Sequence, residues 1–441
     1  MGTQSAAALT ETRGGLAPAG PHLYVGIDIG RRAHVVAAIP QARMENDTWE
    51  RAQARRIPTT VQGFKELTEI LAATGVTLDL VQIGCEPTGG WYGLTAAAWL
   101  ERHGYEVSWL QNWAIHDERA LIIGKQTKTD ALDARLIARL LYERDYMGRR
   151  RGFLHRPPRS CDALRMLVRN RANLVQQRTR YRLQLTAIED VVFPELKEFF
   201  KTSITGTAAR MLLKAFPTPS DLAEASAEAL REVLVVRGRV RNLSSRLLEF
   251  QEVAAESAGL THGIQPILNA QDWLLCQLDR IDEQVAGVEE AIAIALDSWP
   301  ADERAVMDSL PGISTVREAV LFSAIGDLAS YRDDRQLRKM LGWYSEAKES
   351  GSSVSKHHLG HSGNRMARRE IWLWAMQLLT PQAKATPFRA YYQRLCKRGM
   401  PGKVAVGHLA GKLVSVLFFC LRNGEPYDPV RHAAALGLDE T

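Results

Sequence analysis

Short apolar runs separated by glycine, proline and polar residues fill the first third of the sequence. The runs at residues 22–29 and 33–39 are rich in β-branched residues and flank Gly30, so they predict a β-hairpin. Later runs alternate between β-like and helical spacing. The expected strands cover residues 49–58, 78–85 and 105–110, and the expected helices cover 60–73, 91–103 and a segment that begins near Thr129. This order of elements predicts a mixed α/β domain.

The middle of the chain, residues 149–300, has helical apolar spacing. From Ser160 to Ile188, apolar residues recur at steps of three, four and seven, which is typical of an amphipathic helix that can join a coiled coil. Further helical patterns at residues 222–236 and 273–296 contain no residues that point to chemistry. We therefore expect a helical, arginine-rich coiled-coil linker with an insertion.

The last part of the chain, residues 301–441, also has a mainly helical pattern. A Leu-Pro-Gly-Ile step within residues 307–327 resembles a helix-hairpin-helix element, whose backbone amides can bind a phosphate. Ser314 stands where such elements usually carry a second glycine, and an ordinary turn between two helices is the alternative. Two further helices are expected at residues 331–343 and 364–379, with a polar loop between them.

The size and composition of the chain are those of a folded soluble protein. Its 441 residues suffice for two or three domains, and its apolar and charged fractions are 46% and 24%. Residues 1–20 lack a continuous apolar core, which favours a disordered tail over a signal peptide. We expect an N-terminal domain at residues 21–148, the linker described above, and a C-terminal domain at residues 301–441.

Cysteine usage and apolar run length both favour the cytoplasm. The five cysteines form no CxxC pair, which argues against a zinc ribbon or a disulfide framework. The longest apolar run, residues 413–421, is too short to span a bilayer. We expect a cytoplasmic protein without a membrane partner.

Positive charge is concentrated at the start of the linker. Eleven arginines but a single acid, Asp162, lie between Arg149 and Arg182, within a chain of net charge +6. A solvated helix face usually mixes signs, so this block favours a phosphate-rich partner, DNA or RNA. The candidate nucleic-acid-binding residues are Arg149, Arg150, Arg151, Arg169, Arg171, Arg178, Lys356, Arg365 and Arg368.

Four acids occupy the ends of expected elements. Asp28 ends the first strand and Glu86 follows the strand at residues 78–85. Asp130 and Asp133 lie three residues apart at a helix start, so they share one face. Each acid alone is explained by capping or solvation. Together they predict a site for Mg²⁺, which prefers oxygen ligands, and two ions about 4 Å apart can support phosphoryl transfer.

Three motifs contain these acids. They are GIDIG with Asp28, CEPTGGWY with Glu86, and QTKTDALDARLIARL with Asp130 and Asp133. They resemble the DEDD transposases of bacterial insertion sequences, a family that includes the Piv-type DNA invertases. Pro87 and the segment 111–113 depart from the family pattern, outside the acids. The resemblance implies an N-terminal RNase H-like domain similar to the RuvC resolvase.

The resemblance continues in the C-terminal part of the chain. Its Gly342, Ser350-Gly351, Lys356, Gly363-Asn364 and Arg368 follow the family order. It implies that Ser350 is a catalytic nucleophile, although Ser352, Ser353 and Ser355 are close enough to be the equivalent residue. It further implies a structured guide RNA, donor and target DNA duplexes, and assembly as a dimer or tetramer.

Three functions remain open at this point. The first is a Mg²⁺-dependent transposase or recombinase that works through a phosphoserine. The second is a hydrolytic nuclease of the junction-resolvase type, in which Ser350 only contacts DNA. The third is a nucleic-acid-binding protein without catalysis.

Overall fold

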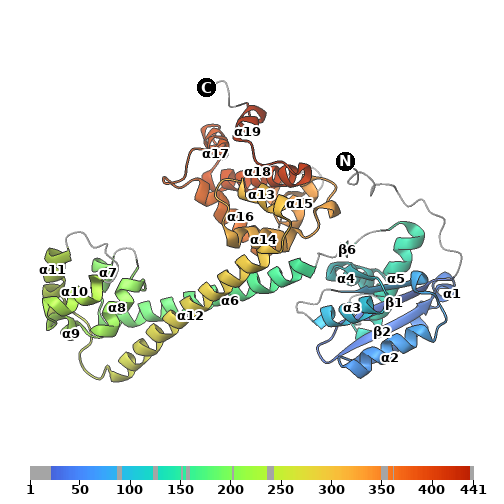
Figure 1. Ribbon diagram of the computed structural model, residues 1–441, viewed down its shortest axis with the longest axis horizontal. Coiled ribbons are helices and arrows are strands. Elements are labelled where there is room, and N and C mark those ends of the chain that lie inside the picture. The colour runs from blue at the N-terminus through green and yellow to red at the C-terminus, as the bar shows by residue number, and fades with distance from the viewer. Residues whose placement is uncertain are drawn as a thin grey trace, which may run out of the picture. The chain divides into compact units, whose positions relative to one another are not determined.

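The computed structural model describes residues 21–86, 92–122, 128–149, 152–154, 159–200, 203–235, 243–348, 356–360 and 362–437. The chain divides into two compact units, Met1–Arg156 and Pro157–Thr441 (Figure 1). The first unit is mixed α/β and the second is mainly helical, which confirms the fold class at this level. The expected boundary near residue 300 stays a prediction.

A six-stranded sheet forms the centre of the first unit, in the order β3-β2-β1-β4-β5-β6. The strands are β1 Leu23–Asp28, β2 Ala33–Pro40, β3 Ala54–Pro58, β4 Val81–Cys85, β5 Val107–Leu110 and β6 Phe153–Leu154. β1, β2 and β3 are antiparallel, β1, β4 and β5 are parallel, and β6 pairs antiparallel with β5. The carboxyl ends of β1, β4 and β5 therefore meet at one edge.

Helices cover both faces of this sheet. Leu23, Val25 and Ile27 share one core with α2 (Val61–Ala72) and α3 (Tyr92–Arg102). Tyr24 faces the opposite core, as expected for the two-residue period of a strand. The helices of that second face are α1 Gln41–Glu45, α4 Asn112–Ile122 and α5 Asp130–Met147.

Two expected strands begin with a 3₁₀ turn. Residues 49–51 form a 3₁₀ turn instead of a strand, because Trp49 is buried in the core beneath α5, under the Arg139 guanidinium. Residues 78–80 likewise form a turn before β4. Helices α1 and α4 were not expected, because neither segment has a long helical apolar pattern.

Two glycines let α5 lie directly on the sheet. Gly26 and Gly84 are register partners in β1 and β4. A Cβ on Gly26 would lie 1.8 Å from the carbonyl oxygen of Ala134, so no larger residue fits without moving α5. Further along, Tyr24 contacts Tyr142 edge-to-face. α5 therefore runs antiparallel to β1, with its N-terminus beside the carboxyl ends of β1 and β4.

Two long helices form the first part of the second unit. α6 (Arg159–Val192) and α12 (Gln265–Asp297) lie side by side and antiparallel (Figure 1). At one end of the pair, a small helical cluster packs around Leu185, Phe193 and Phe250. Its helices are α7 Leu196–Phe199, α8 Thr207–Ala215, α9 Pro219–Ala223, α10 Ala227–Val235 and α11 Leu243–Ala255.

The helical pattern at residues 222–236 is divided between two helices. α9 ends at Ala223, and Ser226 starts α10 by accepting a hydrogen bond from the amide of Ala229 at 3.1 Å. This side-chain cap explains the break, because serine satisfies amides that a helix start leaves without partners.

The remaining helices surround a second large core. They are α13 Ala301–Asp308, α14 Thr315–Ile325, α15 Asp334–Met340, α16 Arg365–Leu378, α17 Pro387–Lys397, α18 Gly402–Asn423 and α19 Pro429–Ala435. By length and composition alone α18 could cross a membrane. It packs against α15, α16 and α17, and its Leu409, Leu413 and Leu417 are fully buried.

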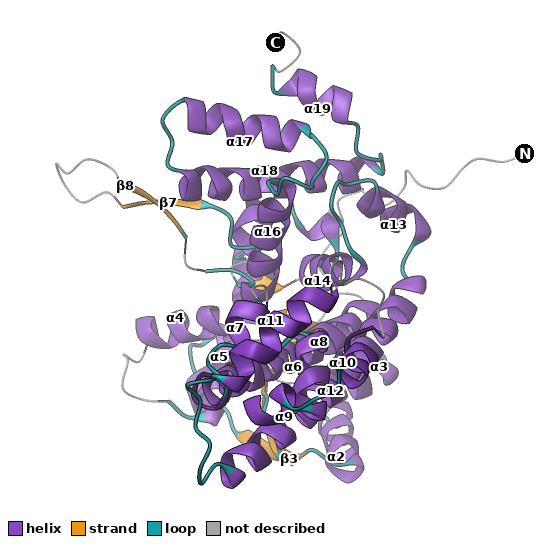
Figure 2. Cartoon of the chain, turned by 90° about the vertical axis from the view of Figure 1, so that its left-hand side faces the viewer, coloured by secondary structure: helices purple, strands orange, loops and turns teal. Residues whose placement is uncertain are grey.

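The polar segment between α15 and α16 is not simply a loop. β7 (Ser345–Lys348) and β8 (Lys356–Leu359) form an antiparallel hairpin there (Figure 2). The expectation of a loop was wrong for these residues, because strand pairing here does not rest on an alternating apolar pattern.

Candidate active site

Asp28 and Glu86 lie together at the carboxyl edge of the sheet. Ile27 of β1 pairs with Cys85 of β4, so each acid occupies the next register position. A hydrogen bond links the two side chains. Two carboxyl groups can form such a bond only when one keeps its proton.

Asp130 and Asp133 reach the same edge from the first turn of α5. Thr129 caps this helix as expected, since its hydroxyl accepts a hydrogen bond from the amide of Leu132 at 3.2 Å. Asp130 is exposed, whereas Asp133 is buried. The helix N-terminus favours both negative charges.

The four acids influence one another electrostatically. The pKa of Asp28 is raised to about 7, most strongly by burial and then by the charges of Glu86, Asp130 and Asp133, while Lys128 acts to lower it. Burial and Asp133 also raise the pKa of Glu86. We call Asp28, Glu86, Asp130 and Asp133 the acidic site.

One guanidinium group enters the acidic site. Nε of Arg119, on α4, donates a hydrogen bond to Oδ1 of Asp133 at 2.9 Å, and Nη2 donates to the same oxygen. The two side chains are 12% and 4% exposed. Sequence reasoning missed Arg119, because the fold of α4 and its position beside α5 were not foreseen.

The described residues contain no group of three or more acid, histidine or cysteine side chains already arranged to hold a metal ion. Within the acidic site, one carboxylate is bound by Arg119 and another shares a hydrogen bond. The ligand chemistry suits Mg²⁺, because carboxylate oxygens are its preferred ligands and a cation relieves their repulsion.

The candidate serine belongs to the segment 349–355, which joins β7 to β8 in the sequence. Ser350 and its neighbours Ser352, Ser353 and Ser355 fall outside the described residues, as do Arg150 and Arg151. The backbone of Lys356 begins β8 and pairs with Lys348. The paired strands therefore fix the two ends of the seven-residue segment 349–355.

The base of that hairpin is tightly packed. The amide of Gly360 donates to the carbonyl of Tyr344 at 3.0 Å. Nη1 of Arg368 donates to the carbonyl of Gly360 at 2.7 Å. Gly342 and Gly363 both have positive φ, and a Cβ on Gly363 would lie 2.6 Å from the Gly342 amide. The glycines of the C-terminal motif thus permit a close backbone approach next to the candidate serine loop.

The candidate nucleic-acid-binding arginines fall into two groups. Arg171 and Arg178 pair with Glu289 and Asp282 of α12, at 2.6 and 3.0 Å, and so join α6 to α12. Arg149 pairs with Glu143, and Arg368 holds the hairpin base. Arg365 is exposed, and Arg169 is exposed on α6, where burial and the charge of Arg165 lower its pKa.

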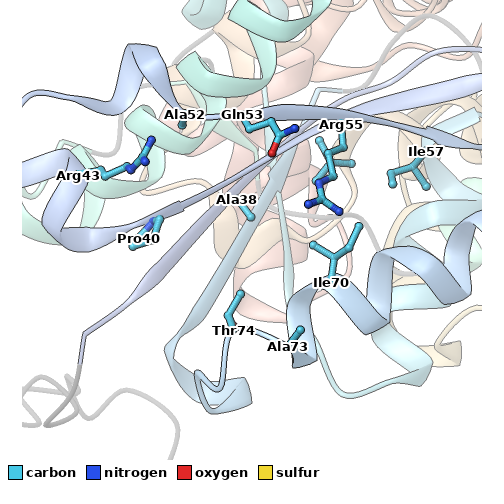
Figure 3. Close-up of a pocket in the computed structure, with 11 residues that line it drawn as sticks. Ala38, Pro40, Arg43, Ala52, Gln53, Arg55, Ile57, Ile70, Ala73 and Thr74 are labelled. Carbon is cyan, nitrogen blue, oxygen red and sulfur yellow. The ribbon is translucent and has the colours of Figure 1, made fainter.

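A separate open pocket of about 400 Å³ lies over β2, β3 and the end of α2 (Figure 3). Its lining includes apolar Ile57 and Ile70 and the guanidinium groups of Arg43 and Arg55. It shares no residue with the acidic site, and no carboxylate lines it. The pocket is therefore not a second acidic centre.

Two family models match the chain. A model of transposases of the DEDD, IS110 type matches residues 25–194, and one described as the transposase IS116/IS110/IS902 family matches residues 304–393. Together they match more than half of the chain. The first includes all four acids of the acidic site, and the second includes the β7–β8 hairpin.

Relatives match over almost the whole length. The chain is 26% identical to an uncharacterized 44.8 kDa protein of insertion element IS116 from Streptomyces clavuligerus, over 92% of this chain and 96% of the relative. It is 26% identical to an uncharacterized 43.6 kDa protein of IS110 from Streptomyces coelicolor, over 92% and 95%. It is 21% identical to the pilin gene-inverting protein of Moraxella bovis, over 93% and 98%. The family expected from the sequence motifs is thereby confirmed, and the chain belongs to the IS116/IS110/IS902 family of insertion-sequence transposases.

Proposed function

We propose that this transposase cuts and rejoins DNA with a divalent-metal site formed by Asp28, Glu86, Asp130 and Asp133, and with Ser350 as nucleophile. The observation that carries the metal site is the meeting of four carboxylates at one sheet edge, where burial and the three neighbouring charges together raise the pKa of Asp28 to about 7. Perturbed acids of this kind cluster at functional sites.

The strand order supports an RNase H-like, RuvC-like assignment for the first unit. Three antiparallel strands are followed by two parallel ones, and the acids lie on the first strand, after the fourth strand and on a late helix. That is the order on which the family resemblance rests. We likewise propose that the turn between α13 and α14 is a helix-hairpin-helix element, since Gly312 there has φ +78°.

The acidic site fits Mg²⁺, with the four carboxylates as its ligands, and we expect two ions. When bound, the metal supplies positive charge to the phosphate oxygens and lowers the barrier to phosphoryl transfer. The protein's part is to fix the carboxylates on separate elements: two strands and one helix. The close contact of α5 with Gly26 and Gly84 holds these elements in register.

Ser350 is proposed to attack a DNA phosphorus. The Oγ–P bond forms, the bond from phosphorus to the leaving DNA oxygen breaks, the serine proton passes to a base, and the leaving oxygen takes up a proton. The phosphoserine ester keeps the energy of the phosphodiester, so a DNA hydroxyl can reverse the step without ATP. The packed base of the β7–β8 hairpin supports this assignment, because it fixes the two strands that the serine segment joins.

The proposed partners are donor and target DNA duplexes and a structured guide RNA. Exposed Arg169 and Arg365 supply positive charge for phosphate contacts. We propose a homodimer or tetramer, because two duplexes must be cut and exchanged, and a location in the bacterial cytoplasm.

A trapping assay tests the proposal. Purified full-length protein, its co-purifying RNA, Mg²⁺ and end-labelled DNA carrying the element junction are resolved on a denaturing gel. We expect a DNA-linked protein band that disappears in Ser350→Ala and in Asp130→Asn, and persists in the matched control Ser362→Ala.

Two other outcomes would replace the proposal. Cleaved DNA without a protein adduct, unchanged in Ser350→Ala, would identify a hydrolytic nuclease of the junction-resolvase type. DNA-dependent activity that survives Asp130→Asn would identify a binding protein whose acids have no catalytic part. A band that persists in Ser350→Ala but disappears in Ser352→Ala or Ser353→Ala would assign the nucleophile to that other serine.

A further inference from the structure

Arg119 is the cation in direct contact with the acidic site. It lies on α4, and its Nε and Nη2 both donate to Oδ1 of Asp133. Both side chains are largely removed from solvent, at 12% and 4% exposure. A charge-assisted contact with this little solvent is strong, and breaking it leaves a buried charge without a partner.

The surroundings of this ion pair are mostly acidic. Glu86 feels the charges of both Asp133 and Arg119, with opposite effects on its pKa. Lys128, which also acts on Asp28 and Glu86, is exposed at the rim, just before α5. Among the residues that the structure describes, Arg119 is therefore the buried positive charge that acts on the acidic site, and Lys128 is the exposed one.

The oxygen that Arg119 holds belongs to one of the proposed metal ligands. Two guanidinium nitrogens of Arg119, one of them 2.9 Å away, already donate to Oδ1 of Asp133. Two cations on one carboxylate oxygen repel each other strongly where solvent is excluded. Arg119 in this position therefore opposes the binding of a divalent ion to the same carboxylate.

We propose that Arg119 is a built-in counter-ion of the acidic site, which neutralises Asp133 in the metal-free protein and competes with the divalent metal for it. This inference rests on the proposed metal site. Arg119 is a positioning residue here, because it stabilises the empty site and sets how readily the site takes up metal. Chemistry on DNA is not needed to observe this role.

Metal binding and thermal unfolding of the full-length protein test the inference. Mn²⁺ is titrated by calorimetry into metal-free wild type, Arg119→Met, Arg119→Lys and the control Arg139→Met. Arg139 is ion-paired with Glu143 on the same unit and faces Trp49 instead of the four acids. Methionine keeps the length of the arginine stem and removes its charge.

We expect Arg119→Met to bind Mn²⁺ about tenfold more tightly than wild type, on the scale of one charge contact. Its metal-free form should melt at a lower temperature, and Mn²⁺ should raise that temperature more than in wild type. Arg119→Lys should fall between the two, because lysine keeps the charge but loses the two-nitrogen contact. Arg139→Met should bind metal as wild type does.

The circular dichroism spectrum shows which of Arg119→Met and Arg119→Lys folds as wild type does. If the folded variants bind Mn²⁺ no more tightly than wild type, the counter-ion role is overturned. Failure of the metal site itself gives a different pattern: wild type then takes up no Mn²⁺, or its binding survives Asp28→Asn and Asp130→Asn. Loss of binding in those two variants, combined with no gain in the Arg119 variants, would remove the inference and keep the metal site.

Discussion

Two clusters of charge in this molecule have opposite balance. In the acidic site, four carboxylates meet one buried guanidinium, that of Arg119. In the second unit, Asp282 of α12 accepts hydrogen bonds from Arg178 and Arg210 at 3.0 and 2.6 Å. Lys214 and Arg210 also pair with the neighbouring Asp279. We call this second group the α12 ion-pair cluster.

The two clusters shift the pKa of an aspartate in opposite directions. Burial and neighbouring carboxylates raise the pKa of Asp28 to about 7. Burial also acts to raise the pKa of Asp282, but the hydrogen bonds from Arg178 and Arg210 outweigh it, so the net shift is downward. A cluster that its own residues neutralise can hold helices together. A cluster with excess negative charge favours the binding of an external cation.

The largest expected difference between the clusters is in catalysis. Asp130→Asn should lower DNA cleavage by about 10³-fold, because it removes a proposed metal ligand where charge develops in the transition state. Asp130 is exposed, so the variant should fold. Asp282→Asn should leave cleavage by folded protein unchanged. The DNA cleavage rates of the two variants are measured at saturating Mg²⁺. Equal losses of rate in both would contradict a catalytic role that is specific to the acidic site.

For the free energy of unfolding, we expect the larger effect in the α12 ion-pair cluster instead of the acidic site. Asp282→Ala should lower the free energy of unfolding by about 2 kcal/mol, because Arg210, 6% exposed, is left without its closest partner. Exposed Glu290→Ala on the same helix serves as the control and should change it by less than about 0.5 kcal/mol. Urea unfolding followed by helical circular dichroism gives both values. A loss in Glu290→Ala as large as in Asp282→Ala would mean that the ion pairs do not stabilise α12.

The pH dependence of stability should separate the acidic site further. Folded Asp28 keeps its proton up to about pH 7, because its pKa is raised to about 7, while the unfolded chain loses this proton near the ordinary aspartate pKa of 3.8. Between these values the folded state binds more protons, so stability falls as pH rises from about 4 to about 7. In metal-free protein, Asp28→Asn should remove this fall and raise the melting temperature at pH 8 by about 3 °C relative to wild type.

Buried Glu189 offers a matched comparison in the second unit. Burial raises its pKa to about 7, against a hydrogen bond that its Oε1 accepts from Gln271 at 2.8 Å. Glu189→Gln should therefore also reduce the loss of stability between about pH 4.5 and 7. Mn²⁺ should stabilise Glu189→Gln at pH 8 as it stabilises wild type, but not Asp28→Asn. Melting curves with and without Mn²⁺ measure this, and equal metal effects in all three proteins would contradict a metal role for Asp28.

The smallest expected effect concerns the arginines. Arg365→Ala should weaken DNA binding uniformly across sequences and reduce the slope of log affinity against log salt by about 1, since one phosphate contact is lost. Arg171→Ala should leave that slope unchanged, because its guanidinium is engaged by Glu289. Fluorescence anisotropy at several salt concentrations gives the slopes. Identical slopes in the two variants would show that pairing across α6 and α12 does not decide which arginines meet DNA.

Local sequence signals predicted the elements that have clear boundaries. Thr129 marked the start of α5, and the apolar runs marked β1, β2 and β4. The order of these elements, together with the family motifs, indicated which four acids to examine. These features are local in sequence or follow from fold order, so a single chain reveals them.

What the sequence did not reveal depends on contacts between distant segments. Arg119 meets Asp133 only because α4 packs beside α5, and α4 has no strong helical pattern of its own. Trp49 interrupts an expected strand because a core beneath α5 accepts its ring. Likewise, the sequence alone does not show that Arg171 and Arg178 form ion pairs, because their partners Glu289 and Asp282 lie on the distant helix α12.

The antiparallel pair of α6 and α12 also sets a length scale. α6 contains 34 residues and α12 contains 33. At 1.5 Å per residue each helix is about 50 Å long. Since B-form DNA rises about 3.4 Å per base pair, this rod equals about fifteen base pairs of duplex. The distance that this helix pair sets between the small helical cluster and the C-terminal core therefore equals the length of about one and a half turns of a double helix.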